Sequence, residues 1–224
     1  MIKFKPRNHE TGMKKSSSSA HLQHSCDMIM GSSYLPKRTG KSRHCGQDAH
    51  FLCREKLTLG VADGVGRWVK KGIDSGKYSR VLLKNSVDAL DRESRGSVNL
   101  RRVLEEAFCM TKSEYSGFML FRNKCKFQSS SQQHCFNQPY QLGNFNYGDG
   151  PDIATEIVVP VESGDVVVVG TDGLLDNMFP YEIEEILSRT QDDKNVAKAR
   201  KLAGTKPRLG RKIDDISVVI AKII

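Results

Sequence analysis

Four short acidic motifs stand where apolar, strand-like runs of this chain begin or end. The motifs are GQDAHF with Asp48, GVADGVG with Asp63, GTDGLLDN with Asp172 and Asp176, and DDISVVI with Asp214 and Asp215. If these strands belong to one sandwich, their ends bring the carboxylates together. Buried like charges are costly unless cations neutralise them, and hard divalent ions prefer oxygen ligands. Gly64 and Gly173 would let the backbone approach such ions without a Cβ in the way. The pattern indicates a divalent-metal site, and simple Asp-Gly turns are the open alternative.

Apolar periodicity predicts both strands and helices in the rest of the chain. Valine-rich runs at 156–161 and 165–170 are typical of strands covered on both faces. Residues 83–90 and 100–108 have apolar side chains at helical spacing, with Ser97 as the expected N-cap of the second helix. Further elements are expected as a hairpin at 49–53 and 57–62, strands at 117–121, 124–127 and from 216, a helix beginning at Pro180, and a basic helix at 195–203.

Length and composition are those of an ordinary globular chain. The 224 residues suffice for one domain, which we expect at 31–224, after a disordered, basic, serine-rich leader at 1–30. No apolar run approaches the ~20 residues of a membrane-spanning helix, so no membrane partner is expected. The six cysteines form no C-x-x-C pair, which favours free thiols in a reducing compartment. An intracellular location is expected, and a plastid, a mitochondrion, the cytosol and the nucleus all stay open.

The net charge of +9 is concentrated at the two ends of the chain. Residues 194–212 hold eight Lys or Arg and no acid, and residues 1–25 hold five against Glu10 alone. Such runs suit nucleic acid or anionic surfaces, so a basic nucleic-acid-binding module is one alternative function. Because no aromatic interleaving or nucleic-acid-binding motif accompanies the charge, we expect solvated tails and helix faces, and no nucleic-acid partner.

A set of longer stretches carries a family resemblance. They are SSYLPK, GQDAHFL, LGVADGVGRWVKKGIDSGKYSR, SGFMLFRN, QQHCFNQPYQL, SGDVVVVGTDGLLDNM and GRKIDDISVVI. In this order, from about residue 31 to the C-terminus, they resemble the metal-dependent type 2C protein Ser/Thr phosphatases, in particular a plant and mitochondrial-type branch. The resemblance implies an α+β fold, with two packed antiparallel β-sheets flanked by helices in an α-β-β-α sandwich. It implies hydrolysis of phosphoserine and phosphothreonine proteins by water that two Mg²⁺ or Mn²⁺ ions activate, in a monomer.

The resemblance also implies which residues hold the metal ions. Asp63 would bridge both ions, and the backbone carbonyl of Gly64 would bind one of them. Asp172 and Asp214 would hold the other ion, directly or through water.

Further residues would support the reaction. Asp48 would organise the reacting water, and Arg43 would bind phosphate, with an ordinary basic loop residue as the alternative for Arg43. Asp176 and Asp215 are expected to be structural or to lie behind the metal ligands. Val65 stands where many relatives have a His, so protonation of the leaving group would fall to water or another residue.

Three departures from the family pattern bear on activity. Gln47 replaces a Glu, which removes a charge and predicts weaker metal binding. Arg67 replaces a Gly in GVADGVGRW, placing a cation near the metal cleft. Between residues 110 and 117 the chain lacks a family segment, Tyr115 stands in place of a metal-binding Asp, and a central strand of the sandwich is expected to be missing. A second, shorter segment is missing between 193 and 210.

The sequence therefore supports two main functional hypotheses. The first is an active Mg²⁺- or Mn²⁺-dependent protein Ser/Thr phosphatase, because Asp63, Asp172 and Asp214 are all present. The second is a catalytically impaired, phosphatase-like protein that acts only as a binding module, because of the three departures.

Overall fold

The structure is a computed structural model, and it describes residues 2–6, 27–37, 46–66, 74–111, 117–122, 124–135, 138–142, 149–189, 195–204 and 213–224. Its strands are β1 (Ile2–Pro6), β2 (Met28–Leu35), β3 (Ala49–Cys53), β4 (Thr58–Ala62), β5 (Gly117–Arg122), β6 (Lys124–Gln128), β7 (Gln133–Cys135), β8 (Gln138–Pro139), β9 (Ile157–Val161), β10 (Val166–Gly170) and β11 (Ile216–Ile223). Its helices are α1 (Ser75–Asp91), α2 (Leu100–Met110), α3 (Asp172–Leu175), α4 (Pro180–Arg189) and α5 (Asn195–Ala203), with a 3-10 turn at Pro151–Ile153.

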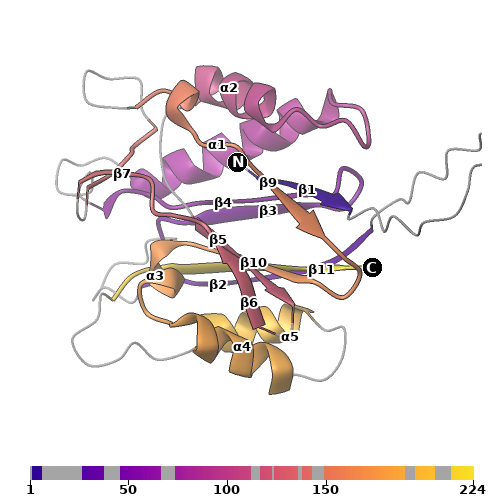
Figure 1. Ribbon diagram of the computed structural model, residues 1–224. Helices are drawn as coiled ribbons and strands as arrows, with labels where there is room; N and C mark the ends of the chain where they lie inside the picture. Colours follow the sequence, from indigo (N-terminus) through magenta and orange to yellow (C-terminus); the bar gives the residue numbers. More distant parts are fainter. Residues whose placement is uncertain are drawn as a thin grey trace, which may run out of the picture.

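Sheets lie between two groups of helices (Figure 1). Helices α1 and α2 cover the β3–β4 hairpin, and α4 and α5 lie on the other side of the molecule. Within the described residues, the largest sheet has the strand order β2–β11–β10–β5–β6, and its neighbouring strands are all antiparallel. The hairpin β3–β4 and the short pair β7–β8 are antiparallel as well. The chain therefore has an α+β fold with several antiparallel sheets and flanking helices, as the sequence predicted in outline.

One pairing departs from the expected sheets of antiparallel strands. β1 pairs with β9 in parallel, with Ile2 opposite Ile157. Strand β1 comes from the segment expected to be a disordered leader, and β2 also begins within it, at Met28. The expectation of disorder is therefore wrong for these strand residues, because β1 finds the edge of β9 as a partner, and an unpaired edge is costly. Residues 7–26 lie outside the described part, and the division into leader and domain stays a prediction.

The valine-rich strands form the centre of the large sheet. β10 lies between β11 and β5, and Val167 and Val168 are fully buried although their side chains point to opposite faces. β11 is buried along almost its whole length. For residues 165–170 this confirms the prediction of a strand covered on both faces. For 156–161 that prediction is wrong, because Val158 and Pro160 of β9 are exposed and only Val159 and Val161 are buried.

Each face of the large sheet has its own apolar cluster. The cluster facing β4 and β9 comprises Met28, Met30, Val61, Val159, Val161, Val167, Val169, Val219, Ala221 and Ile223. The cluster facing the helices α3 to α5 comprises Val168, Leu174, Met178, Ile183, Ala199, Leu202, Ala203, Ile216, Val218 and Ile220. Because alternate residues of β11 supply the two clusters, this strand ties the layers together and fixes the position of Asp214 and Asp215 at its start.

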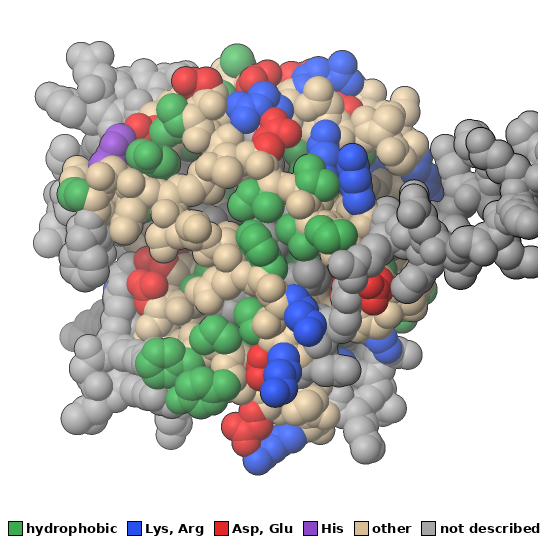
Figure 2. Space-filling model, in the orientation of Figure 1, with side chains coloured by type: hydrophobic (Ala, Val, Ile, Leu, Met, Phe, Trp, Pro, Cys, Tyr) green, Lys and Arg blue, Asp and Glu red, His purple; other side chains and the backbone are tan. Residues whose placement is uncertain are grey.

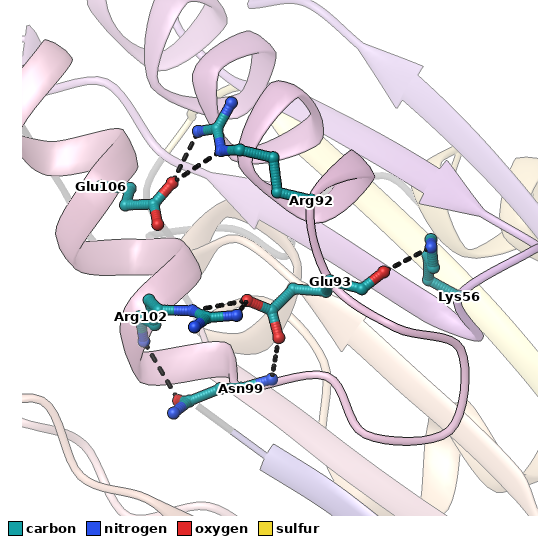
Figure 3. A network of polar contacts seen from close by, with 6 residues as sticks. All are labelled: Lys56, Arg92, Glu93, Asn99, Arg102 and Glu106. Carbon is teal, nitrogen blue, oxygen red and sulfur yellow. Dashed lines mark hydrogen bonds and ion pairs between the residues drawn. The ribbon is translucent and has the colours of Figure 1, made fainter.

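The N-cap of the second predicted helix lies two residues later than expected. Asn99, not Ser97, is the N-cap of α2, and its side chain accepts a hydrogen bond from the Arg102 amide at 3.1 Å. Figure 3 shows why: Glu93, which is buried, accepts hydrogen bonds from the Asn99 amide at 2.8 Å and from the Arg102 guanidinium. The Asn99 amide, and then Arg102, hold the pKa of Glu93 below its usual value. The loop before α2 is thus fixed by the side chain of Glu93, six residues before Asn99, a contact that sequence periodicity does not reveal.

A cavity of about 840 Å³ lies between the β3–β4 hairpin, helices α1 and α2, and β9. Its lining is largely apolar and includes Leu59, Val61, Leu82 and Val103. None of the acidic residues Asp48, Asp63, Asp172 and Asp214 lines it, so this cavity is separate from the predicted metal site.

Two further expectations concern the chain as a whole. No helix of the described stretches combines the length and the apolar character that crossing a bilayer requires. The four cysteines within the described residues, Cys53, Cys109, Cys125 and Cys135, are free thiols, as predicted.

Candidate metal centre

Two antiparallel strand pairs carry the acidic motifs to strand ends. Asp48 directly precedes β3 and Asp63 directly follows β4, and the first residue of β3 pairs with the last residue of β4. Asp48 and Asp63 therefore flank one end of the hairpin. In the large sheet the last residue of β10 pairs near the start of β11, so Asp172 and Asp214 flank one end of these two strands. The hairpin packs against β10 and β11.

The electrostatics show that these strand ends meet. Burial raises the pKa of Asp63 to about 10, with further contributions from the charges of Asp48, Asp172 and Asp214 and a hydrogen bond to Asp172. Burial also raises the pKa of Asp48 to about 7, opposed by a hydrogen bond from Thr171 and supported by the charges of the neighbouring aspartates. The charges of Asp172 and Asp214 thus reach both Asp48 and Asp63, so these four carboxylates from four strand ends lie close together.

The chemistry of this donor set fits a hard divalent cation. The side chains are carboxylates, and because they are shielded from water, their negative charges would be poorly solvated. Oxygen ligands of this kind are those that hard divalent cations prefer. Among the described residues, however, no three His, Cys, Asp or Glu side chains stand in a geometry that surrounds one ion. Charges act over several ångströms, whereas Mg²⁺ needs ligands at about 2.1 Å. The carboxylates thus lie near one another without surrounding a single ion position. To hold an ion they would have to move closer together or bind it through water molecules.

Asp215 organises the backbone behind this cluster. Its carboxylate accepts hydrogen bonds from the backbone amide of Gln47 at 2.6 Å and from the backbone amide of Lys37. Asp215 is only 2% exposed. It therefore ties the end of β2 and the segment before Asp48 to the start of β11, which agrees with the structural role expected for it.

Thr171 supports Asp48 from across the sandwich, a contact that sequence reasoning missed. Its hydroxyl donates to Asp48 Oδ2 at 2.7 Å and accepts from the Ser217 amide at 3.0 Å. The Thr171 side chain is completely buried. Its position directly before Asp172 was the one available signal, but the partner lies 123 residues away in the sequence. Thr171 thus links Asp48, at the start of the β3–β4 hairpin, to β10 and β11.

Thr171→Val should destabilise the protein by about 1–3 kcal/mol, because the Ser217 amide and the Asp48 carboxylate each lose a buried hydrogen-bond partner. Urea unfolding followed by circular dichroism measures this change. Thr171→Ser keeps the hydroxyl and should retain most of the stability. If the Val and Ser variants are equally stable, the hydroxyl contacts contribute nothing.

Two other residues lie at the cluster: Lys37, which was not singled out from the sequence, and Gln47, which was. Lys37 Nζ lies 3.9 Å from Asp214 Oδ1, so an ammonium group stands beside one of the predicted metal ligands. The Gln47 side chain faces the loop after Asp63, since its Oε1 lies 3.0 Å from the position that a Cβ on Gly66 would take. Gln47 is therefore next to the site, as its place beside Asp48 in the sequence suggests.

The predicted site residues thus fall into two groups. Asp48, Asp63, Asp172 and Asp214 come together, and Gly64 is buried directly after Asp63. Arg43, the predicted phosphate-binding residue, lies outside the described residues. The same holds for Arg67 and Tyr115.

The layered arrangement of helices and antiparallel sheets is shared with solved phosphatase structures. The X-ray structure of the photosystem II phosphatase PBCP has a TM-score of 0.75 at 23% identity, over 88% of this chain and 99% of that one. The catalytic domain of the serine/threonine phosphatase PstP, solved with two manganese ions, has a TM-score of 0.60 at 14% identity, over 89% of this chain and all of that chain. At these identities the likeness concerns the fold.

Sequence relatives define the family. Probable protein phosphatase 2C 55 of Arabidopsis thaliana is 38% identical over 88% of this chain and 52% of its own length. Putative protein phosphatase 2C 24 of Oryza sativa is 31% identical over 80% of this chain and 73% of its own. No protein-family model matches the chain. The similarity to these relatives shows that the chain belongs to the type 2C protein phosphatase family.

The chain is shorter than several relatives. It spans about half the length of the Arabidopsis phosphatase 2C 55 and 58% of the length of phosphatase 2C 80 from the same plant. The alignment to phosphatase 2C 55 runs over 242 positions, although only 88% of the 224 residues take part. That relative therefore has several tens of residues with no counterpart here, which agrees with the missing segments noted in the sequence.

Proposed function

We propose that this chain is a Mn²⁺- or Mg²⁺-dependent phosphatase of phosphoserine and phosphothreonine proteins, with two ions per subunit. The observation that carries the proposal is the gathering of Asp48, Asp63, Asp172 and Asp214 at one end of the hairpin and the large sheet, where burial and the charges of Asp172 and Asp214 raise the pKa of Asp48 and Asp63. Membership of the type 2C family supports the same function, and the PstP structure with two manganese ions supports the choice of metal.

The residues of the cluster have separate roles in this proposal. When bound, divalent cations would supply Lewis-acid activation of water and neutralise the phosphate. Asp63 and the Gly64 carbonyl, together with Asp172 and Asp214, would hold them. Asp48 is oriented by the Thr171 hydroxyl at Oδ2, which leaves its second oxygen to accept a hydrogen bond from the attacking water. Substrate phosphate would bind at the same edge, with Arg43 as its proposed partner.

Phosphate release from a phosphothreonine peptide tests the proposal. The full chain in Mn²⁺ should release inorganic phosphate, and Asp63→Asn should reduce the rate by about 100-fold or more, as removal of a charge-stabilising group does. Asp91→Asn, which changes an exposed aspartate at the end of α1, is the matched control and should keep the full rate. Folded wild-type protein without Mn²⁺-dependent release, or an unaffected Asp63→Asn variant, would refute the activity.

A phosphatase-like binding module is the second candidate. Gln47 beside the cluster favours it. So does the absence from this chain of several tens of residues that Arabidopsis phosphatase 2C 55 has. The third observation is that no three metal-ligating side chains converge among the described residues. Titration calorimetry with Mn²⁺ separates the two functions. Binding of two ions argues for the enzyme, and no binding argues for the module.

Gln47→Glu should strengthen Mn²⁺ binding by about tenfold, because it adds a carboxylate beside the loop that follows Asp63. Calorimetric dissociation constants measure the effect. Gln128→Glu adds the same charge on the exposed face of β6 and should leave the affinity unchanged. Equal affinities for wild type and Gln47→Glu would show that residue 47 does not act on the ions.

A further inference from the structure

An exposed aromatic pair stands at the start of α4, a few residues after Asp172 of the acidic cluster. The rings of Phe179 and Tyr181 stack with centroids 5.6 Å apart and planes 13° from parallel. They are 44% and 58% exposed, so the stacked pair forms an exposed apolar patch. Figure 2 shows hydrophobic side chains gathered at the lower left of the molecule, below acidic side chains that lie over α3. We call Phe179 and Tyr181 the aromatic ledge.

The backbone holds the aromatic ledge in place. Glu182 Oε2 accepts a hydrogen bond from the Phe179 amide at 2.7 Å, and the Phe179 carbonyl accepts from the Glu182 amide at 3.0 Å. This reciprocal pair caps α4, whose first residue, Pro180, has a restricted φ. Met178, directly before the ledge, is buried in the core. The rings are thus presented on a rigid support, so a ligand would bind them at little cost in ordering.

The ledge follows Asp172 of the acidic cluster through the short helix α3 and the turn after it. From Asp172 to Met178 the backbone follows helix-type hydrogen bonds, including Asp176 amide to Asp172 carbonyl at 2.8 Å and Met178 amide to Leu174 carbonyl at 3.0 Å. Seven residues at 1.5 Å per residue span about 10 Å. An extended peptide covers the same distance in about three residues. A phosphoresidue at the cluster would therefore place a side chain three positions away over the ledge.

We propose that the aromatic ledge binds an apolar side chain, aromatic by preference, located about three residues from the phosphorylated residue of a protein substrate. This inference rests on the proposed phosphatase function, because the cluster must bind the phosphate for the spacing to apply. The exposed carboxylate of Asp176 lies along the path between cluster and ledge. It disfavours an acidic residue at the intervening substrate positions, since like charges repel. The ledge thus selects among phosphopeptides, while the cluster performs the reaction.

Matched phosphothreonine peptides test the ledge. One has Ala at both positions three residues from the phosphothreonine, and two others have Phe at one of them, on the N- or C-terminal side. With Mn²⁺, the full chain should show a KM about tenfold lower for one Phe peptide than for the Ala peptide. In the double variant Phe179→Ala/Tyr181→Ala this ratio should fall to about one. Met110→Ala removes an equally exposed apolar side chain at the end of α2 and should keep the tenfold ratio.

Two further outcomes separate the ledge from the proposed activity. If no peptide is hydrolysed, the activity fails, and anisotropy of the fluorescein-labelled Phe and Ala phosphopeptides decides the ledge by binding alone. Tighter binding of the Phe peptide, lost in the double variant, supports the ledge. Equal KM and equal binding for both peptides, or a preference that survives in the double variant, overturns it. Self-association of wild type that disappears in the double variant would assign the rings to a second copy and also overturn it.

Discussion

Gly173→Ala is expected to destabilise the protein by about 3 kcal/mol, the upper range for overpacking, and to weaken Mn²⁺ binding. A Cβ on Gly173 would lie 1.9 Å from the backbone oxygen of Asp215 and 2.9 Å from its carbonyl carbon. Because these are backbone atoms in a buried position, no side-chain rotation relieves the contact. Separation of α3 from the start of β11 would move Asp172 away from Asp214. Urea unfolding measures the stability, and calorimetry measures the metal affinity.

Gly150→Ala is the matched control. A Cβ there would meet only the end of the flexible Asp152 side chain, and the backbone at Gly150 has a φ of −85°, which suits alanine. The control should retain wild-type stability and Mn²⁺ affinity. If Gly173→Ala behaves like Gly150→Ala, the close packing of α3 against β11 does not hold in solution.

In the absence of metal, the protein should lose stability as the pH rises from about 5 to 8. The folded-state pKa of Asp63 is about 10 and that of Asp48 about 7, both above the value of about 4 for an unfolded aspartate. Above pH 4 the unfolded chain therefore releases protons that the folded chain retains, so the free energy of unfolding falls with pH. For Asp48 the fall ends near pH 7, and for Asp63 it continues toward pH 10. Urea unfolding at both pH values in EDTA measures the loss.

Asp63→Asn should remove most of this dependence. At pH 8 in EDTA we expect the variant to be about 2 kcal/mol more stable than wild type, because the asparagine side chain is neutral without a proton, whereas Asp63 must take up a proton on folding. Mn²⁺ should stabilise wild type at pH 8 and stabilise the variant far less, because an ion that binds the folded state raises stability. Asp91→Asn should follow wild type in every condition. A wild-type protein that is equally stable at pH 5 and 8 in EDTA would show that the acids are not buried together.

Much of the local structure was predictable because it depends on neighbouring residues. The hairpin β3–β4, the helices α1, α2, α4 and α5, and the strands β10 and β11 all follow from apolar periodicity and turn residues. The start of α2 did not, because Glu93 and Asn99 are joined by a contact that periodicity does not encode. Similarly, β9 and β10 are neighbours in the sequence but belong to different sheets.

For the candidate site, the sequence alone determined which acids stand at strand ends and which family they resemble. The tertiary structure decided that Asp48, Asp63, Asp172 and Asp214 meet, because hairpin and large sheet pack with these ends together. It also decided that Thr171 holds Asp48 and that β1 pairs with β9. The physical reason is range: turns and periodicity act over a few residues, whereas these contacts depend on packing between segments far apart in the chain.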